Sequence, residues 1–314
     1  MTASPPSIRK YSDIPGWFNW QDRLMFDTLL AASDASPGVL VELGAYLGRS
    51  AVIIGNHLAN HERFVVVDLF GSDAPLGESS ADGANRHENT YSYKTLTRQQ
   101  FEANYLALHA KLPEVVHDLS SAVVDHVEPG TARFVHIDAS HLYPQVAEDI
   151  RNSKTLLRAD GVVVFDDYRA PHTPGVAAAV WEAVANLGLI PFALTARKFY
   201  GTFGPAAEHL ATVRNLVTGD GRLRFAEQHI GSHAVIRVQP TRPKQSAEPA
   251  VLTDDALDKL SERLAQRLAA GLTNDVTSAL ASTQQTSRRA RLVRDFAPPA
   301  LARAISRRRT QRRR

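Results

Sequence analysis

Residues 134–167 read FVHIDASHLYPQVAEDIRNSKTLLRADGVVVFDD, and this stretch decides the fold. Phe134–Ile137 and Val162–Phe165 are short apolar runs of the kind that form buried parallel strands. Between them, Pro144–Leu157 places its apolar side chains at helical spacing. The stretch therefore predicts a strand, a crossover helix and a second strand parallel to the first.

Three aspartates follow these two strands. Asp138 comes after the first strand, and Asp166 and Asp167 come after the second, while His141 lies three residues past Asp138. Parallel strands end at the same edge of a sheet, where open α/β sheets bind ligands. A single aspartate in such a place would be interpreted as a helix cap. Three converging carboxylates indicate a functional site.

The composition limits the class of protein. The chain has 314 residues, 44% of them hydrophobic, which is enough for one α/β domain of about 200 residues with appendages. It has no cysteine, which excludes disulfides, thiolate nucleophiles and cysteine-bound metals, and fits a reducing compartment. Residues 1–10 lack the apolar core of a signal peptide, and no segment is apolar enough to span a membrane. We therefore expect a cytoplasmic protein.

A second site element follows the predicted strand Val39–Leu43. This strand contains Glu42, and the turn after it holds Gly44 and Gly48 before Ser50 opens a helix. Glycines at such a turn let backbone N–H groups approach a ligand, and a helix N-terminus carries partial positive charge. The spacing departs from the G-x-G-x-x-G pattern of dinucleotide sites, so a nicotinamide or flavin cofactor is not expected.

The next predicted strand, Phe64–Val67, ends at Asp68. Asp68 lies 26 residues past Glu42, where a nucleoside-binding α/β sheet places an acid on ribose hydroxyls. The alternative is a turn or helix cap, and we favour the ribose role. Residues 70–98 are polar and rich in glycine, and a connection of this length is typical of a lid or of disorder. We interpret it as a lid.

The motifs VELGAYLGRS, VVVDLF, FVHIDASHLY and LLRADGVVVFDDY, in this order and spacing, resemble those of the class I S-adenosylmethionine (SAM)-dependent methyltransferases. Within that superfamily they are most similar to the metal-dependent O-methyltransferases, which include catechol O-methyltransferase and enzymes acting on macrolide sugars. The resemblance covers roughly residues 14–203, although residues 70–98 have no counterpart in the family pattern. It implies a Rossmann-like, doubly wound, seven-stranded, mostly parallel α/β sheet whose last strand is antiparallel.

The resemblance also implies roles for the site residues. SAM would lie across the strand ends, with Glu42, Gly44 and Gly48 beside its methionine part, Ser50 nearby and Asp68 on the ribose. Asp118 and Ser120 would lie near the adenine. Asp138, Asp166 and Asp167 would bind the divalent metal ion, Mg²⁺ or Mn²⁺. The catalytic residues would be His141 and Asp138.

The chemistry of these residue types supports the same interpretation. A hydroxyl is a poor nucleophile while it is protonated, and three aspartates form an oxygen-rich site suited to Mg²⁺ or Mn²⁺, which lowers the pKa of a bound hydroxyl. A neutral His141 can then accept the proton. The alternatives for His141 are a cap on the following helix and a fourth metal ligand.

The predicted domain organisation is an N-terminal helical cap (1–38), a methyltransferase domain (39–238), a linker (239–252), an amphipathic helix (253–284) and a basic tail (285–314). The amphipathic helix either packs on its own domain or pairs between subunits of a homo-oligomer. Residues 288–314 hold eleven arginines against one aspartate, while the preceding residues carry 25 basic and 32 acidic side chains. For this tail we rank contact with an anionic membrane, at its inner face, above nucleic acid.

The expected function is a SAM- and metal-dependent O-methyltransferase that acts on a hydroxyl of a sugar or other small molecule, which includes a glycolipid or polysaccharide. Two alternatives stay open. One is a relative that uses the same fold for hydroxylation, and the other is a scaffold that engages membrane or nucleic acid through its basic tail.

Overall fold

The computed structural model describes residues 8–33, 37–74, 76–78, 83, 86–87, 93 and 95–241. These residues belong to one compact unit, which spans residues 1–242. The predicted lid spans residues 70–98, and most of its residues between 79 and 94 lie outside the described residues. So do nearly all of the predicted linker, the whole amphipathic helix and the basic tail.

Strands and helices alternate along most of the chain, as expected for an α/β fold. The strands are β1 (Val39–Leu43), β2 (Phe64–Val67), β3 (Glu114–Val116), β4 (Ala132–Ile137), β5 (Leu157–Phe165), β6 (Ile190–Leu194), β7 (Phe199–Thr202), β8 (Leu223–Ile230) and β9 (His233–Pro240). The α-helices are α1 (Trp20–Ala32), α2 (Arg49–Gly55), α4 (Arg98–Leu106), α5 (Tyr143–Leu156), α6 (Pro174–Asn186) and α7 (Ala207–Gly219). The part of the chain that the structure describes also contains two 3₁₀ turns, η1 (Tyr11–Asp13) and η2 (Ser120–Asp125).

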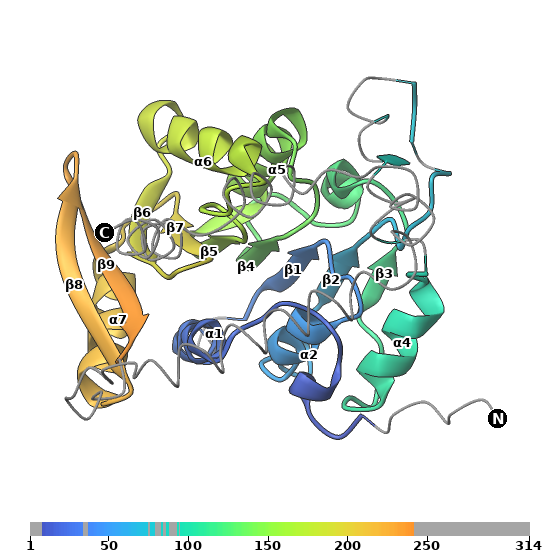
Figure 1. The fold of residues 1–314 in the computed structure, drawn as a ribbon, viewed down its shortest axis with the longest axis horizontal. Coiled ribbons are helices and arrows are strands. Elements are labelled where there is room, and N and C mark those ends of the chain that lie inside the picture. The colour runs from blue at the N-terminus through green and yellow to red at the C-terminus, as the bar shows by residue number, and fades with distance from the viewer. Residues whose placement is uncertain are drawn as a thin grey trace, which may run out of the picture. The chain divides into compact units, whose positions relative to one another are not determined.

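The nine strands of the described residues form one sheet in the order β3-β2-β1-β4-β5-β7-β6-β9-β8 (Figure 1). Strands β1 to β5 pair in parallel, and β7 is antiparallel to both of its neighbours. The predicted α/β class and the antiparallel seventh strand are confirmed. The hairpin of β8 and β9 extends the sheet from seven strands to nine, because β9 pairs in parallel with the edge strand β6.

The central strand, helix and strand form as the sequence predicts. Phe134 pairs with Val162 and Ile137 with Phe165, so β4 and β5 end level with each other. Pro144 lies in the first turn of α5, where a missing N–H costs no helical hydrogen bond. The aspartates that follow the two strands therefore start from the same edge of the sheet.

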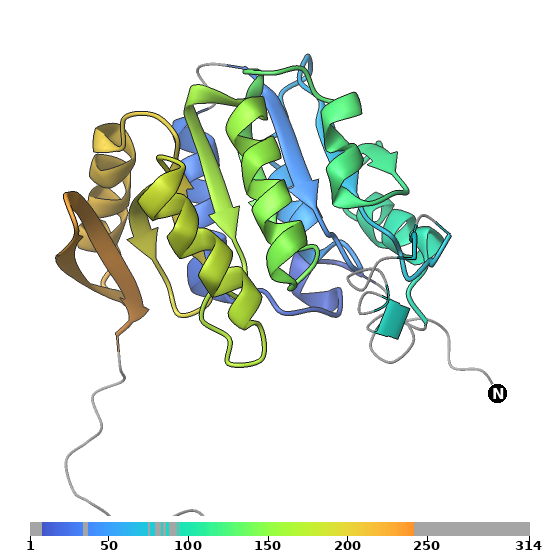
Figure 2. The same cartoon turned by 90° about the horizontal axis from the view of Figure 1, so that it is seen from above.

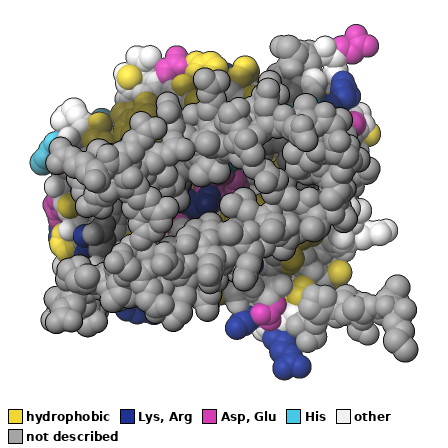
Figure 3. Space-filling view, viewed as in Figure 1, with side chains coloured by type: hydrophobic (Ala, Val, Ile, Leu, Met, Phe, Trp, Pro, Cys, Tyr) yellow, Lys and Arg dark blue, Asp and Glu magenta, His cyan; other side chains and the backbone are white. Residues whose placement is uncertain are grey.

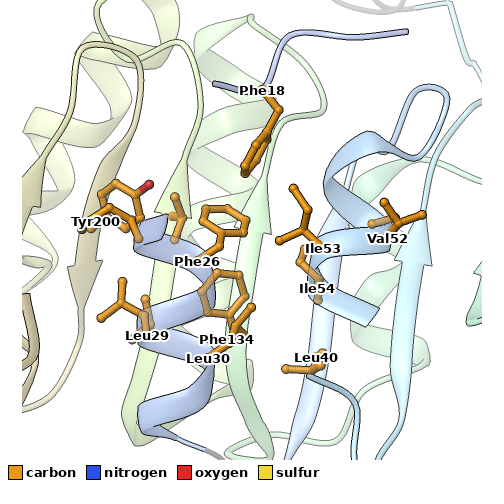
Figure 4. Packing of buried hydrophobic residues seen from close by; sticks show 14 of the residues in the cluster. Phe18, Phe26, Leu29, Leu30, Leu40, Val52, Ile53, Ile54, Phe134 and Tyr200 are labelled. Atoms are coloured by element: carbon orange, nitrogen blue, oxygen red, sulfur yellow. The ribbon is translucent and has the colours of Figure 1, made fainter. Parts of the chain in front are cut away.

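Helices cover both faces of the sheet, with α5 and α6 on one face and α1, α2 and α7 on the other (Figures 1 and 2). Each face buries its own apolar cluster. On the second face, Phe26, Leu29 and Leu30 of α1 pack toward Phe134 of β4 (Figure 4). Within the described part of the chain, no helix is both long and apolar enough to cross a bilayer.

Candidate active site at the carboxyl edge of the sheet

The sheet itself holds the backbone of two of the three aspartates, Asp138 and Asp166. The N–H of Asp138 donates to the carbonyl of Leu43 at 2.8 Å, and the N–H of Asp166 donates to the carbonyl of Ile137 at 3.0 Å. Both bonds continue the parallel ladder one residue past the strands. The acids are therefore held on a rigid edge rather than on a free loop.

Two overlapping groups of possible metal ligands occur at this edge. One consists of His136, Asp138 and Asp166, and the other of Asp138, His141 and Asp167, each with ligand atoms within 4.8 Å of one another. Asp138 is common to both groups. The structure thus brings together Asp138, His141, Asp166 and Asp167, the four residues that the sequence proposed for metal binding and catalysis.

Asp138 lies in the most unfavourable electrostatic position of the cluster. Burial raises its pKa well above the usual value for an aspartate, and the nearby carboxylate of Asp166 raises it further. The ammonium of Lys198 offsets part of this effect. A carboxyl group held in this way favours a proton or a cation as a partner.

A buried polar layer that the sequence analysis did not identify lies beneath the acids. Lys198 and His136 are fully buried, and the Lys198 ammonium forms an ion pair with Asp166. The Lys198 Nζ atom lies 3.0 Å from His136 Nε2, and His136 Nδ1 lies 2.8 Å from Oε1 of Glu42. Two strand registers could have indicated this layer. Glu42 of β1 pairs with His136 of β4, and Phe165 of β5 pairs with Phe199 of β7, the residue after Lys198.

Glu42 belongs to this buried layer. Its side chain is fully buried, and it is not among the residues that line either cavity described below. Burial raises its pKa to about 8, although the Ser50 hydroxyl and Lys198 both act to lower it. The predicted contact of Glu42 with the methionine part of SAM stays a prediction.

Asp68 shapes the turn after β1. Its Oδ2 atom accepts hydrogen bonds from the N–H groups of Ala45 at 2.6 Å and Tyr46 at 2.9 Å, and Oδ1 accepts from Phe70 at 2.5 Å. Tyr46 and Phe70 both have positive φ angles, a conformation that these bonds help to hold. Asp68 therefore stabilises the turn, which was the alternative role in the sequence analysis. Its contact with the ribose of SAM stays a prediction.

The two glycines of this turn have different neighbours. Gly44 has φ +79°, and a Cβ there would lie 2.1 Å from the carbonyl oxygen of Asp138. A side chain at position 44 would clash with this carbonyl, so the close approach of the two loops requires glycine here, whatever ligand binds nearby. Gly48, also at positive φ, caps α2 and would contact the ring of Phe101 if it carried a Cβ.

Two cavities open along the carboxyl edge. The larger, about 370 Å³, is lined among others by Asp138, His141, Asp166, Asp167 and Ser50. The smaller, about 100 Å³, is lined among others by Asp68, Asp118, Ser120, Ser140 and Gln145. The residues common to both linings are Gly44, Tyr46, Tyr93 and Asp138, so the cavities meet at the acid cluster.

Aromatic and basic side chains line the remaining wall of the larger cavity. The rings of Trp17 and Tyr46 are 5.6 Å apart, and those of Tyr46 and Tyr93 are 5.7 Å apart. Trp17 is 68% exposed and lines the cavity, so its ring is accessible on this wall. Arg197 also lines the cavity and pairs with Asp167 at 3.1 Å. Basic and acidic side chains are visible close together near the middle of the face in Figure 3.

The residues present fit the two ligands that the family resemblance implies, a divalent metal ion and SAM. Carboxylate oxygens are ligands that Mg²⁺ and Mn²⁺ prefer, and a cation would offset the charge that burial makes costly at Asp138. The adjoining cavities offer a polar end at Asp118 and Ser120 and a reactive end at the acids. This arrangement fits an elongated cofactor whose reacting group lies beside the acid cluster.

Part of the chain is similar to a known protein family. A family model described as a methyltransferase domain matches residues 41–168, which contain the turn after β1 and all three aspartates. No curated protein sequence matches the chain.

Solved structures give remote likenesses. The TDP-rhamnose 3'-O-methyltransferase CalS11 of calicheamicin biosynthesis is 18% identical over 59% of this chain and 80% of its own, with a TM-score of 0.40. The O-methyltransferase NovP is 17% identical over 59% and 79%, with a TM-score of 0.46. An O-methyltransferase from Bacillus cereus in complex with SAH is 14% identical over 61% and 85%, with a TM-score of 0.40. Likenesses this remote carry no conclusion about the substrate.

Proposed function

We propose that the chain is a class I SAM-dependent methyltransferase that transfers a methyl group to a hydroxyl oxygen with the help of a divalent metal ion, in line with the methyltransferase family model that matches residues 41–168. The observation that carries this proposal is the convergence of Asp138, His141, Asp166 and Asp167 on one cavity. A protein that used the fold only as a scaffold would have no need of three carboxylates and an imidazole that line one cavity.

In the proposed cofactor site, SAM occupies the smaller cavity and reaches the larger one. Asp118 and Ser120 lie at the adenine end, Asp68 lies between, and Gly44 lies where the two cavities meet. Ser50 lines the larger cavity, while Gly48 and Glu42 support the site from behind. Methyl transfer from a sulfonium is an in-line displacement, so the site must also exclude water and orient the acceptor.

In the proposed metal site, Asp138, Asp166 and Asp167 hold Mg²⁺ or Mn²⁺, which would lower the pKa of the acceptor hydroxyl when bound. His141 lines the same cavity, and its Nε2 atom lies 3.7 Å from Oδ2 of Asp167. In this position the imidazole can accept the hydroxyl proton while Asp167 stabilises the resulting positive charge.

The proposed acceptor is a sugar or another hydroxylated small molecule, free or as part of a glycan. The wall of Trp17, Tyr46 and Tyr93 supports this, because aromatic faces suit the flat apolar side of a sugar ring while polar residues bind its hydroxyls. Contact of residues 288–314 with an anionic membrane and assembly into a homo-oligomer remain predictions, because the segments concerned lie outside the described residues.

Methyl transfer from methyl-labelled SAM to a panel of sugars, nucleotide sugars and catechols tests this function, with products read by mass spectrometry. We expect label in at least one acceptor, loss of transfer in EDTA, and recovery with Mg²⁺ or Mn²⁺. Full transfer in EDTA would remove the metal from the proposal. Incorporation of oxygen rather than a methyl group would favour the hydroxylase alternative.

A further inference from the structure

The turn between β6 and β7 places a lysine inside the acid cluster. Lys198 immediately precedes β7 and is 1% exposed. Its ammonium pairs with Oδ2 of Asp166 and lies 4.8 Å from the centre of the Phe18 ring and 5.7 Å from that of Phe26. Burying an ammonium costs several kcal/mol unless charges and hydrogen bonds compensate for it. The ion pair with Asp166 supplies this compensation for Lys198.

The histidine next to Lys198 does not share its charge. An ammonium only donates hydrogen bonds, so His136 Nε2 accepts from Lys198, and His136 Nδ1 carries the proton that it donates to Glu42. The imidazole is therefore neutral, and Lys198 supplies the positive charge of this layer.

The partner of Lys198 has both oxygens engaged. Oδ2 of Asp166 receives the ammonium, and Oδ1 accepts from the N–H of Asp167 at 2.7 Å. Each carboxylate oxygen has a second lone pair, so Asp166 can bind a metal ion while it keeps these bonds. Lysine and metal would then share one carboxylate.

The charge of the cluster fits this sharing. Three ionised aspartates carry three negative charges, which one ammonium and one divalent ion would balance. Arg197 also pairs with Asp167, but its side chain is 47% exposed, so solvent screens its charge. Lys198 is buried, and its effect on a cation bound nearby is screened much less.

We propose that Lys198 is a positioning residue that shares Asp166 with the divalent ion and thereby lowers the affinity of the acid cluster for that ion. Lys198 keeps Asp166 oriented while no metal is bound, and it makes the metal exchangeable when bound. This inference rests on the proposed metal site and adds to it a residue that the sequence analysis did not assign.

Mn²⁺ binding to the full-length protein, followed at pH 8 by electron paramagnetic resonance of free Mn²⁺, tests the proposal. We expect Lys198→Met to bind Mn²⁺ at least about tenfold more tightly than the unmutated protein, because Asp166 no longer divides its charge between the ammonium and the ion. Lys198→Arg keeps the charge and should bind within about threefold of the unmutated protein. Arg197→Met, from the same turn but exposed, is the matched control and should also change affinity by less than about threefold.

A second pair of variants separates sharing of Asp166 from a general effect of charge. In an Asp166→Asn background, Lys198→Met should change Mn²⁺ affinity by less than about threefold, because the shared carboxylate is gone. Lys198→Gln keeps a hydrogen-bond donor and serves if Lys198→Met does not fold, as judged by circular dichroism. It too should bind Mn²⁺ more tightly.

Equal or weaker Mn²⁺ binding by folded Lys198→Met and Lys198→Gln would overturn the proposal, and so would the absence of Mn²⁺ binding in every variant. A merely structural lysine predicts weaker binding, since its loss would misplace Asp166. If the neutral variants bind Mn²⁺ and the unmutated protein does not, the proposal stands, while metal dependence of the native reaction fails.

Discussion

Strand β4 has a buried charge at each end, and the two ends differ in how that charge is satisfied. At its start, Arg133 is 1% exposed and forms a two-bond ion pair with Glu62, at 2.7 and 2.9 Å. The same guanidinium donates to the carbonyls of Leu30 and His57 and to the hydroxyl of Ser33. Burial alone would raise the pKa of Glu62, but hydrogen bonds from Arg133 and from backbone N–H groups outweigh it and lower the pKa.

At the other end of β4, acids outnumber the bases that could pair with them. Lys198 is the buried cation, whereas Glu42, Asp138 and Asp166 all lie close to it. Burial raises the pKa of both Glu42 and Asp138. The first end is a structural ion pair that needs no ligand, and the second end favours an additional cation.

The largest expected effect concerns the reactive end. His141→Ala should lower kcat by about 10²- to 10⁴-fold if His141 is the general base, and should leave SAM binding intact. The measurement is the pH dependence of methyl transfer, in which the limb due to the base should disappear. His172→Ala is the matched control, since His172 lines the same cavity, and it should lower kcat by less than about tenfold. An unchanged pH profile in His141→Ala would exclude it as the base.

At the structural end, Arg133→Met should cost about 3–5 kcal/mol of unfolding free energy, because Glu62 would be left as a buried, unpaired charge. Denaturant unfolding measures this. Arg214→Met removes the arginine of an exposed pair with Glu227 and should leave the midpoint unchanged. If both variants lose the same stability, the burial of Arg133 is not what makes its pair strong.

The two buried glutamates should respond oppositely to pH. The pKa of Glu42 is about 8 in the folded protein and about 4.5 when unfolded, so its contribution to stability falls as pH rises from about 4.5 to 8. Glu42→Gln cannot ionise, and relative to the unmutated protein it should gain about 3–4 kcal/mol between pH 5 and pH 8.

Glu62 is the control for this comparison. Its folded pKa is lowered, so the stability it contributes is fully present above the unfolded pKa and is lost as pH falls through the folded pKa. Glu62→Gln should therefore be destabilised by a constant amount between pH 5 and 8. Thermal unfolding at several pH values checks both variants, and parallel curves for the Glu42 and Glu62 variants would contradict the distinction between the two ends.

The smallest expected effect concerns the acceptor. Trp17→Ala should raise KM for a sugar acceptor by about three- to tenfold and change kcat little, because the ring contributes binding and not chemistry. Trp20→Ala is the matched control, since Trp20 is 38% exposed and is not part of the cavity lining. An equal rise in KM for both variants would show that the aromatic wall does not contact the acceptor.

The sequence predicted the elements whose signal is local. The apolar runs of β4 and β5 and the helical spacing of α5 lie within one stretch, and the acids follow the strands directly. The roles of Glu42 and Asp68 were harder to predict, because the sequence does not show whether a carboxylate at a strand end faces a ligand or a backbone N–H group. Here Asp68 accepts three backbone hydrogen bonds and Glu42 contacts His136.

Lys198 was missed for a related reason. Its contact with Asp166 depends on the antiparallel register of β7 with β5, which joins residues 32 positions apart. A lysine before a strand is usually solvated, and nothing local distinguishes a buried one. The place of the β8–β9 hairpin beside β6 likewise depends on tertiary pairing, which no local pattern shows.

Calorimetry of SAM binding tests the central claim most directly, namely that the cavities at the carboxyl edge of the sheet hold a methyl donor beside the acid cluster. The account predicts saturable binding to the unmutated protein and its loss in Ser120→Trp, which fills the smaller cavity. It also predicts unchanged binding in Val124→Trp, which lies in the same turn, η2, but is 45% exposed and outside the cavity lining. No binding to the unmutated protein, or equal binding by Ser120→Trp, would contradict it.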